Sequence, residues 1–165
     1  MFENIQIKPM DQTEALEIAN KWKYPAPYNF YDMTADQEDY DEILNKEQRK
    51  NTYFSVKNNN ELVGFFCVFP KDYSSKNHIE MGIGMKPKLT GAGFGKSFVQ
   101  LVVDYLNKHY FRPTIWLSVA DFNQRAMKVY EQVGFRYIQK VQQEANGGEY
   151  TFVIMNNEVK ASQFN

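Results

Sequence analysis

Residues 85–96 have the sequence Met85-Lys86-Pro87-Lys88-Leu89-Thr90-Gly91-Ala92-Gly93-Phe94-Gly95-Lys96. Its glycines separate a strand-like apolar run, Ile79 to Met85, from an amphipathic run that continues to Tyr110. Glycines let backbone N–H groups approach an anion closely, and the N-terminus of the helix that follows adds partial positive charge. The stretch therefore predicts a strand, a phosphate-binding turn and a long helix.

The spacing of this loop can be compared with two nucleotide-binding motifs. The end of a P-loop fits Gly95-Lys96-Ser97, but Thr90 stands where its first glycine belongs. The dinucleotide fingerprint fits Gly91 and Gly93, but it then requires glycine at the position of Lys96. Neither motif is complete, so a small nucleotide-binding enzyme is the less favoured alternative.

Hydrophobic periodicity predicts the other elements. Helices are expected over residues 11–23, 34–50 and 123–133, and strands over 5–7, 52–56, 62–69, 79–85, 114–119, 134–141 and 150–155. The order is β-α-α-β-β-β-α-β-α-β-β, which predicts a mixed sheet with helices on both faces, an α/β (α+β) fold. The connection through the long helix should place strands 79–85 and 114–119 parallel. We expect one domain over residues 1–165.

Composition excludes several classes of protein. The chain is 43% hydrophobic and 24% charged with a net charge of -1, so it lacks the basic footprint of a nucleic-acid-binding domain. No run approaches the roughly 18 apolar residues of a membrane span, and residues 1–8 are unlike a signal peptide. We therefore expect a cytoplasmic protein with no nucleic-acid or membrane partner. The one cysteine, Cys67, lies in an apolar run and should be a buried core thiol.

Two segments resemble the sequence motifs of the GNAT acetyltransferase superfamily. Residues 85–96 are similar to its acetyl-CoA-binding motif, Gln/Arg-x-x-Gly-x-Gly/Ala at the start of a helix. Its second motif resembles Leu117-Ser118-Val119, Asn123-Gln124-Arg125-Ala126, Tyr130-Glu131 and Gly134-Phe135. The resemblance implies the fold of that family, with acetyl-CoA as cosubstrate and no metal. The chain departs from the motif at Thr90, where the family has a Gln or Arg that often assists the phosphates.

The resemblance also implies roles for individual residues. The cosubstrate would contact Ile83, Gly84, Met85, Gly91, Ala92, Gly93, Phe94, Gly95, Lys96, Ser97 and Asn123. Its pantetheine would lie along strand 79–85, in a gap where two parallel strands splay, with a backbone N–H near Met85 as oxyanion donor. Tyr130 would protonate the leaving sulfur, and Glu80 is the best candidate for the base, directly or through water. The structural alternatives are a core tyrosine at 130, an exposed carboxylate at 80 and a helix N-cap at Asn123.

The acceptor side of the family is formed by its first helices and the loop between them. Here that region is rich in aromatic and acidic residues, and it contains no Lys or Arg from Tyr24 to Asn45. Such a surface suits a cationic amine, and Tyr28, Tyr31 and Asp32 are candidate acceptor contacts. A packed aromatic loop beside a solvated helix face is the alternative. The acceptor could be a small polyamine or aminoglycoside-like amine, an amino acid or a protein N-terminus.

Two further questions stay open from the sequence. A cofactor-binding sensor that keeps the fold without turnover is an alternative to an enzyme. The chain could be a monomer or a homodimer.

Overall fold

A computed structural model describes residues 2–71 and 77–159. Its sheet has seven strands in the order β1-β2-β3-β4-β5-β7-β6. The strands are β1 (Ile5–Pro9), β2 (Tyr53–Asn58), β3 (Glu61–Pro70), β4 (His78–Met85), β5 (Thr114–Ala120), β6 (Arg136–Ala145) and β7 (Gly148–Asn156). Strands β4 and β5 are parallel and the other neighbours are antiparallel. The predicted mixed sheet and its parallel pair are confirmed.

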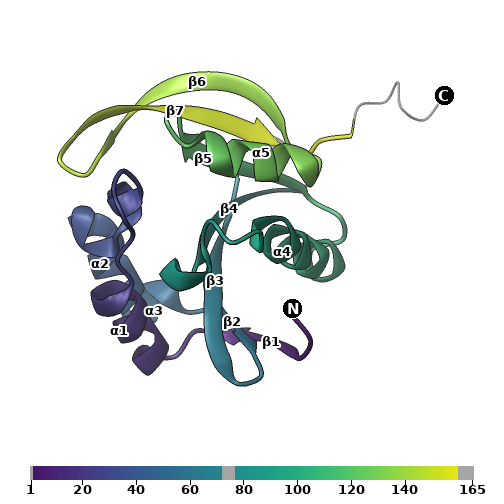
Figure 1. Ribbon diagram of the computed structural model, residues 1–165. Coiled ribbons are helices and arrows are strands. Elements are labelled where there is room, and N and C mark those ends of the chain that lie inside the picture. The colour runs from purple at the N-terminus through teal and green to yellow at the C-terminus, as the bar shows by residue number, and fades with distance from the viewer. Residues whose placement is uncertain (1, 72–76, 160–165) are drawn as a thin grey trace.

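Helices cover both faces of the sheet (Figure 1). One face packs against α4 (Gly95–His109) and α5 (Gln124–Gln132), and the other against α1 (Gln12–Lys21), α2 (Gln37–Leu44) and α3 (Lys46–Arg49). The apolar stripe predicted for the long helix is buried at Phe98, Val99, Val102, Val103 and Leu106. The order of the predicted helices and strands is thus confirmed, with α3 and three 3-10 turns in addition.

The single helix predicted over residues 34–50 is wrong. The chain instead forms a 3-10 turn η2 (Met33–Ala35), then α2, then α3. The Asp36 side chain accepts hydrogen bonds from the N–H groups of Glu38 and Asp39, and Asn45 caps α3 in the same way. Side chains of this kind accept hydrogen bonds from the free N–H groups at the start of a helix. New helices therefore begin after Asp36 and after Asn45, and the predicted single helix is interrupted at both residues. The preceding aromatic loop contains another 3-10 turn, η1 (Tyr28–Tyr31).

The two parallel strands separate after three paired residues. Pairing of β4 with β5 ends at Glu80 and Trp116, and β5 continues beside β7 alone. The Lys86 N–H donates to the Val63 carbonyl, so the even-numbered residues of this stretch pair with β3. The backbone groups of Ile83 and Met85 consequently point toward the gap between β4 and β5. This is the splay that the family resemblance implied.

No helix within residues 2–71 and 77–159 combines the length and apolar character needed to cross a membrane.

Candidate active site

The glycine loop is shaped to leave backbone N–H groups uncovered. Gly91 and Gly93 have φ of +70° and +87°, which side-chain-bearing residues rarely adopt. A Cβ at Gly95 would lie 3.2 Å from Val129 Cγ2, so this glycine lets α4 pack closely against α5. Phe94, at the N-cap position of α4, makes no side-chain capping bond. The start of α4 therefore fits an anion such as a pyrophosphate.

Arg125 brings a positive charge to this loop. A Cβ built on Gly91 would lie 3.1 Å from Arg125 Nη1, so the guanidinium occupies the space beside that glycine. Its central carbon lies 4.0 Å from the centre of the Tyr28 ring, a cation–π contact. Sequence reasoning included Arg125 in the second motif without giving it a role. The available signal was a basic residue near the start of α5 together with Thr90, the position where the family usually carries Gln or Arg.

Tyr31 and Asn123 meet at the end of β5. The Tyr31 hydroxyl oxygen accepts hydrogen bonds from the Ala120 N–H and from Asn123 Nδ2, both at 3.2 Å. Asn123 Oδ1 accepts a bond from the Ala126 N–H at 3.1 Å, so the N-cap prediction is confirmed. Asn123 is buried, and its amide thereby ties the acceptor loop to the start of α5.

Tyr130 lies beside this pair with its hydroxyl accessible. Its ring is half-buried and makes an edge contact with Phe135 at 6.0 Å. No buried side-chain nitrogen or oxygen in the described part of the chain lacks a hydrogen-bond partner. The Tyr130 hydroxyl makes no hydrogen bond there, so its oxygen is not fully enclosed by protein. Burial, and then the nearby Tyr31, raise the pKa of Tyr130, which keeps its proton in place at neutral pH.

Tyr24 is hydrogen-bonded to the last residue of β4. Its hydroxyl donates to the Met85 carbonyl at 2.8 Å, and its N–H donates to Asp32 Oδ1 at 2.9 Å. Burial, and then the Asp32 charge, raise the pKa of Tyr24. Asp32, a predicted acceptor contact, is thus engaged in holding Tyr24. Sequence reasoning placed Tyr24 in the aromatic loop but missed this contact, because nothing in the pattern shows which strand a loop residue reaches.

Glu80 lies where β4 and β5 begin to separate. It forms an ion pair with Lys71 at 3.6 Å, and Lys71 lies over the Trp116 ring at 5.1 Å. In the part of the chain that is described, no hydrogen bond or ion pair joins Glu80 to the tyrosines. A base at Glu80 would therefore work at a distance, through water.

The β4 glycines serve packing against β3. A Cβ at Gly82 would lie 2.6 Å from Cys67 Sγ, and one at Gly84 would lie 2.4 Å from Phe65 Cε1. The glycines therefore make room for side chains of β3 on the α1–α2 face. The gap on the other side arises from the lost β4–β5 pairing.

The loop between α1 and α2 is fixed against the β6–β7 hairpin (Figure 1). Asn146 in the hairpin turn donates its N–H to Asp36 Oδ2 at 2.9 Å and its Nδ2 to the Phe30 carbonyl at 2.8 Å. The Asn146 N–H, the largest influence, lowers the pKa of Asp36. Phe30 is the centre of an aromatic cluster with Tyr31, Phe122, Tyr150 and Phe152, at ring distances of 4.9 to 6.1 Å.

Carboxylates gather on α2, next to this loop. Partial burial, and then the charges of Asp36, Glu42 and Glu38, raise the pKa of Asp39 to about 6. Glu42 accepts a hydrogen bond of 2.6 Å from the Tyr53 hydroxyl. The neighbouring carboxylates Asp36, Glu42 and Glu38 add to the effect of burial, and such a group of negative charges favours a cation.

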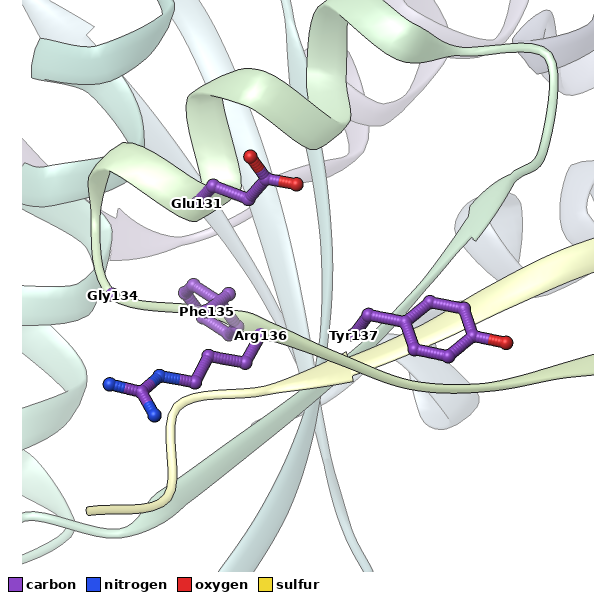
Figure 2. A pocket seen from close by; sticks show the side chains of 5 residues that line it. All are labelled: Glu131, Gly134, Phe135, Arg136 and Tyr137. Atoms are coloured by element: carbon purple, nitrogen blue, oxygen red, sulfur yellow. The ribbon is translucent and has the colours of Figure 1, made fainter. Parts of the chain in front are cut away.

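A hollow at the other end of α5 is separate from these residues (Figure 2). It is lined by Glu131, Gly134, Phe135, Arg136 and Tyr137. Arg136 and Tyr137 point in opposite directions from the start of β6. None of the predicted site residues lines this hollow, so the chemistry is better placed at the glycine loop and the open edge of β4.

Comparisons with known structures agree with this arrangement. The Vibrio cholerae spermidine N-acetyltransferase in complex with CoA and spermine matches with a TM-score of 0.70 and 20% identity, over 93% of this chain and 94% of that chain. A spermidine N-acetyltransferase SpeG K23-Q34 chimera from Vibrio cholerae and hSSAT matches with a TM-score of 0.72 and 21% identity, over 93% of this chain and 95% of that chain. The ribosomal-protein-S5-alanine acetyltransferase of Vibrio fischeri matches with a TM-score of 0.65 and 16% identity, over 94% of this chain and 93% of that chain. At these identities the likeness shows the fold.

The family is shown by the sequence itself. A search of curated proteins finds no match. The family model described as Acetyltransferase (GNAT) family matches residues 14–135, which include the glycine loop, β5 and all of α5. Its members use acetyl-CoA, and the uncapped start of α4 and the open edge of β4 fit that cosubstrate. The chain belongs to the acetyltransferase (GNAT) family and is an acetyl-CoA-dependent N-acetyltransferase.

Proposed function

We propose that this enzyme acetylates a primary amine by direct attack in a ternary complex, and that a small cationic amine is its favoured acceptor. The observation that carries the proposal is the group of carboxylates on α2, whose mutual repulsion contributes to raising the pKa of Asp39 to about 6. A cation that binds among these carboxylates relieves that repulsion. Two of the similar structures are spermidine N-acetyltransferases, which supports a polyamine as the first acceptor to test.

The aromatic loop adds a second feature that suits such an acceptor. Asn146 joins the Phe30 carbonyl to Asp36 at the start of α2, and Asn123 at the start of α5 binds the Tyr31 hydroxyl. Aromatic faces attract ammonium groups, and a fixed loop presents them without a large ordering cost. The amine would pass along this loop to the gap between β4 and β5.

The chain's own groups then act at the gap. Acetyl-CoA supplies the activated acetyl group when bound. The Met85 N–H points into the gap and would donate to the oxygen that becomes negative during attack, while Tyr24 holds the same strand end through the Met85 carbonyl. Glu80 would take the amine proton through water. Tyr130 would give its hydroxyl proton to the sulfur that leaves, since the phenol carries that proton at neutral pH.

Acceptor kinetics test the proposed substrate class. In a Glu38→Gln/Asp39→Asn double variant, KM for spermidine should rise severalfold while kcat and the KM for acetyl-CoA stay unchanged. Asp104→Asn, which removes an exposed carboxylate of α4, is the matched control. A spermidine KM equal to that of the parent would refute the cationic acceptor site.

A protein N-terminus is the second candidate acceptor. It is favoured by the structural likeness to the ribosomal-protein-S5-alanine acetyltransferase. A panel that includes alanine-starting peptides beside amines separates the two. Turnover only with peptides would favour this second candidate. Tight acetyl-CoA binding without turnover on any acceptor would instead indicate a sensor.

A further inference from the structure

We infer that Arg125 binds the pyrophosphate of the cosubstrate and, through its stacking on Tyr28, links that contact to the acceptor loop. The inference concerns the donor side of the reaction and does not depend on which amine is acetylated. It rests on one side chain that touches two loops far apart in sequence: the glycine loop at Gly91 and the 3-10 turn η1 at Tyr28.

The side chains that precede the glycines supply little positive charge to the loop. The Thr90 hydroxyl donates to the Pro87 carbonyl at 2.6 Å, so it is engaged within the turn before the loop. Lys86 and Lys88, which precede the loop, both pair with Glu61, at 3.2 and 3.0 Å. These side chains are held toward β3 or within the turn. A pyrophosphate at the start of α4 would gain little charge from them.

Arg125 is placed to supply such a charge, in addition to the exposed Lys96 in the first turn of α4. Its Nη1 lies where a side chain on Gly91 would have been, within reach of an anion held by the loop. No ion pair to Arg125 occurs within residues 2–71 and 77–159, and its side chain is exposed. A guanidinium presents several donors in one plane, so it can bind a phosphate while its face stays on an aromatic ring. Arg125 thus supplies the charge that the family motif usually places at the Thr90 position.

The same side chain couples the two substrates. Tyr28 is half-buried and belongs to η1, which carries Tyr31 and the aromatic cluster of the acceptor loop. A phosphate that fixes the guanidinium also fixes the surface on which Tyr28 packs. If the bound cosubstrate raises the affinity for an acceptor by ordering this loop, the acceptor must raise the affinity for the cosubstrate by the same factor.

Calorimetric titration with CoA, dephospho-CoA and pantetheine tests the contact. Arg125→Gln should weaken CoA and dephospho-CoA alike, by about ten- to a hundredfold, because each loses a charged hydrogen bond to its pyrophosphate. Pantetheine, followed as a competitor of acetyl-CoA, should have the same inhibition constant in the variant and the parent, because it has no phosphate. Lys108→Gln, at the far end of α4, is the charge control and should bind CoA like the parent. Circular dichroism of each variant confirms that it is folded, and Arg125→Lys should recover part of the affinity.

Two outcomes would overturn the assignment. Unchanged CoA affinity in Arg125→Gln would show that the pyrophosphate does not contact this side chain. An equal loss for pantetheine and CoA would show that Arg125 only maintains the fold of the site.

The link to the acceptor loop needs its own variants. Tyr28→Leu should weaken CoA by about threefold, Tyr28→Phe should not, and the double variant with Arg125→Gln should lose no more than Arg125→Gln alone. Strictly additive losses in this cycle would refute the coupling while leaving the phosphate contact intact.

Discussion

Replacing Tyr24 by phenylalanine should loosen the end of β4 without removing any packed ring. The lost hydroxyl donates to the Met85 carbonyl at 2.8 Å in a partly buried position. A hydrogen bond of this kind contributes about 1 kcal/mol, and leaving its acceptor unpaired raises the cost to about 1–2 kcal/mol. For a domain of this size that corresponds to a fall in Tm of about 2–8 °C.

The same change should slow catalysis, because Met85 also carries the proposed oxyanion donor on its N–H, in the neighbouring peptide group. Removing such a donor costs about a hundredfold or more, and a peptide that is merely less well held should cost about tenfold in kcat. The KM for acetyl-CoA should change little, since the glycine loop is intact. Tyr24 has a raised pKa, so it remains a donor at neutral pH, and its stabilising effect should be lost only as the pH rises past about 10.

Calorimetry and release of CoA thiol measure the two effects in one set of variants. Tyr40→Phe is the matched control, because its hydroxyl donates at 2.9 Å to Asn20 on the exposed surface. That control should keep the parent kcat and lose little stability. Parent-like Tm and kcat in Tyr24→Phe would refute the argument that this hydroxyl holds the strand end.

Three further predictions concern the surroundings of the site. Asp39→Asn should stabilise the protein at pH 7 by about 0.5–1 kcal/mol, because the raised native pKa of Asp39 makes its charged form unfavourable; the gain should vanish in denaturation at pH 4, and a gain that persists there would contradict this cause. Arg49→Met should cost about 3 kcal/mol in urea denaturation, because this buried guanidinium donates to the Met10 and Ile43 carbonyls and to Gln12; a loss below about 1 kcal/mol would show these bonds to be dispensable. Burial raises the pKa of Cys67 to about 12, so a thiol reagent at pH 8 should modify it only after unfolding, and rapid modification of the native protein would contradict its burial.

Periodicity was sufficient for most of the fold because the core and the pattern agree. The apolar stripe of α4 and the continuous apolar run of β3 are both buried, so each element can be predicted from its own residues. Residues 34–50 differ because their break depends on Asp36 and Asn45 side chains that cap new helices. A capping residue in a polar segment is easily taken for part of one continuous helix.

The candidate site divides in the same way. The glycine loop could be predicted because Gly91 and Gly93 meet a local backbone requirement. Tyr24 contacts Met85, 61 residues away in the sequence. Arg125 contacts Tyr28, 97 residues away, and Gly91, 34 residues away. The tertiary fold alone decides such contacts, so sequence patterns could suggest residue types without showing partners. The role of Glu80 stays a prediction, since its ion pair with Lys71 neither assigns nor removes it.

The most direct test of the account is the release of CoA thiol from acetyl-CoA in the presence of an amine panel, with the parent protein and Tyr130→Phe compared at equal concentration. The account predicts release that depends on a cationic amine such as spermidine, and a kcat at least about tenfold lower in the variant with little change in either KM. Equal kcat in the two proteins would contradict the role of Tyr130 as the acid. Failure of the parent protein to bind acetyl-CoA would contradict the central claim.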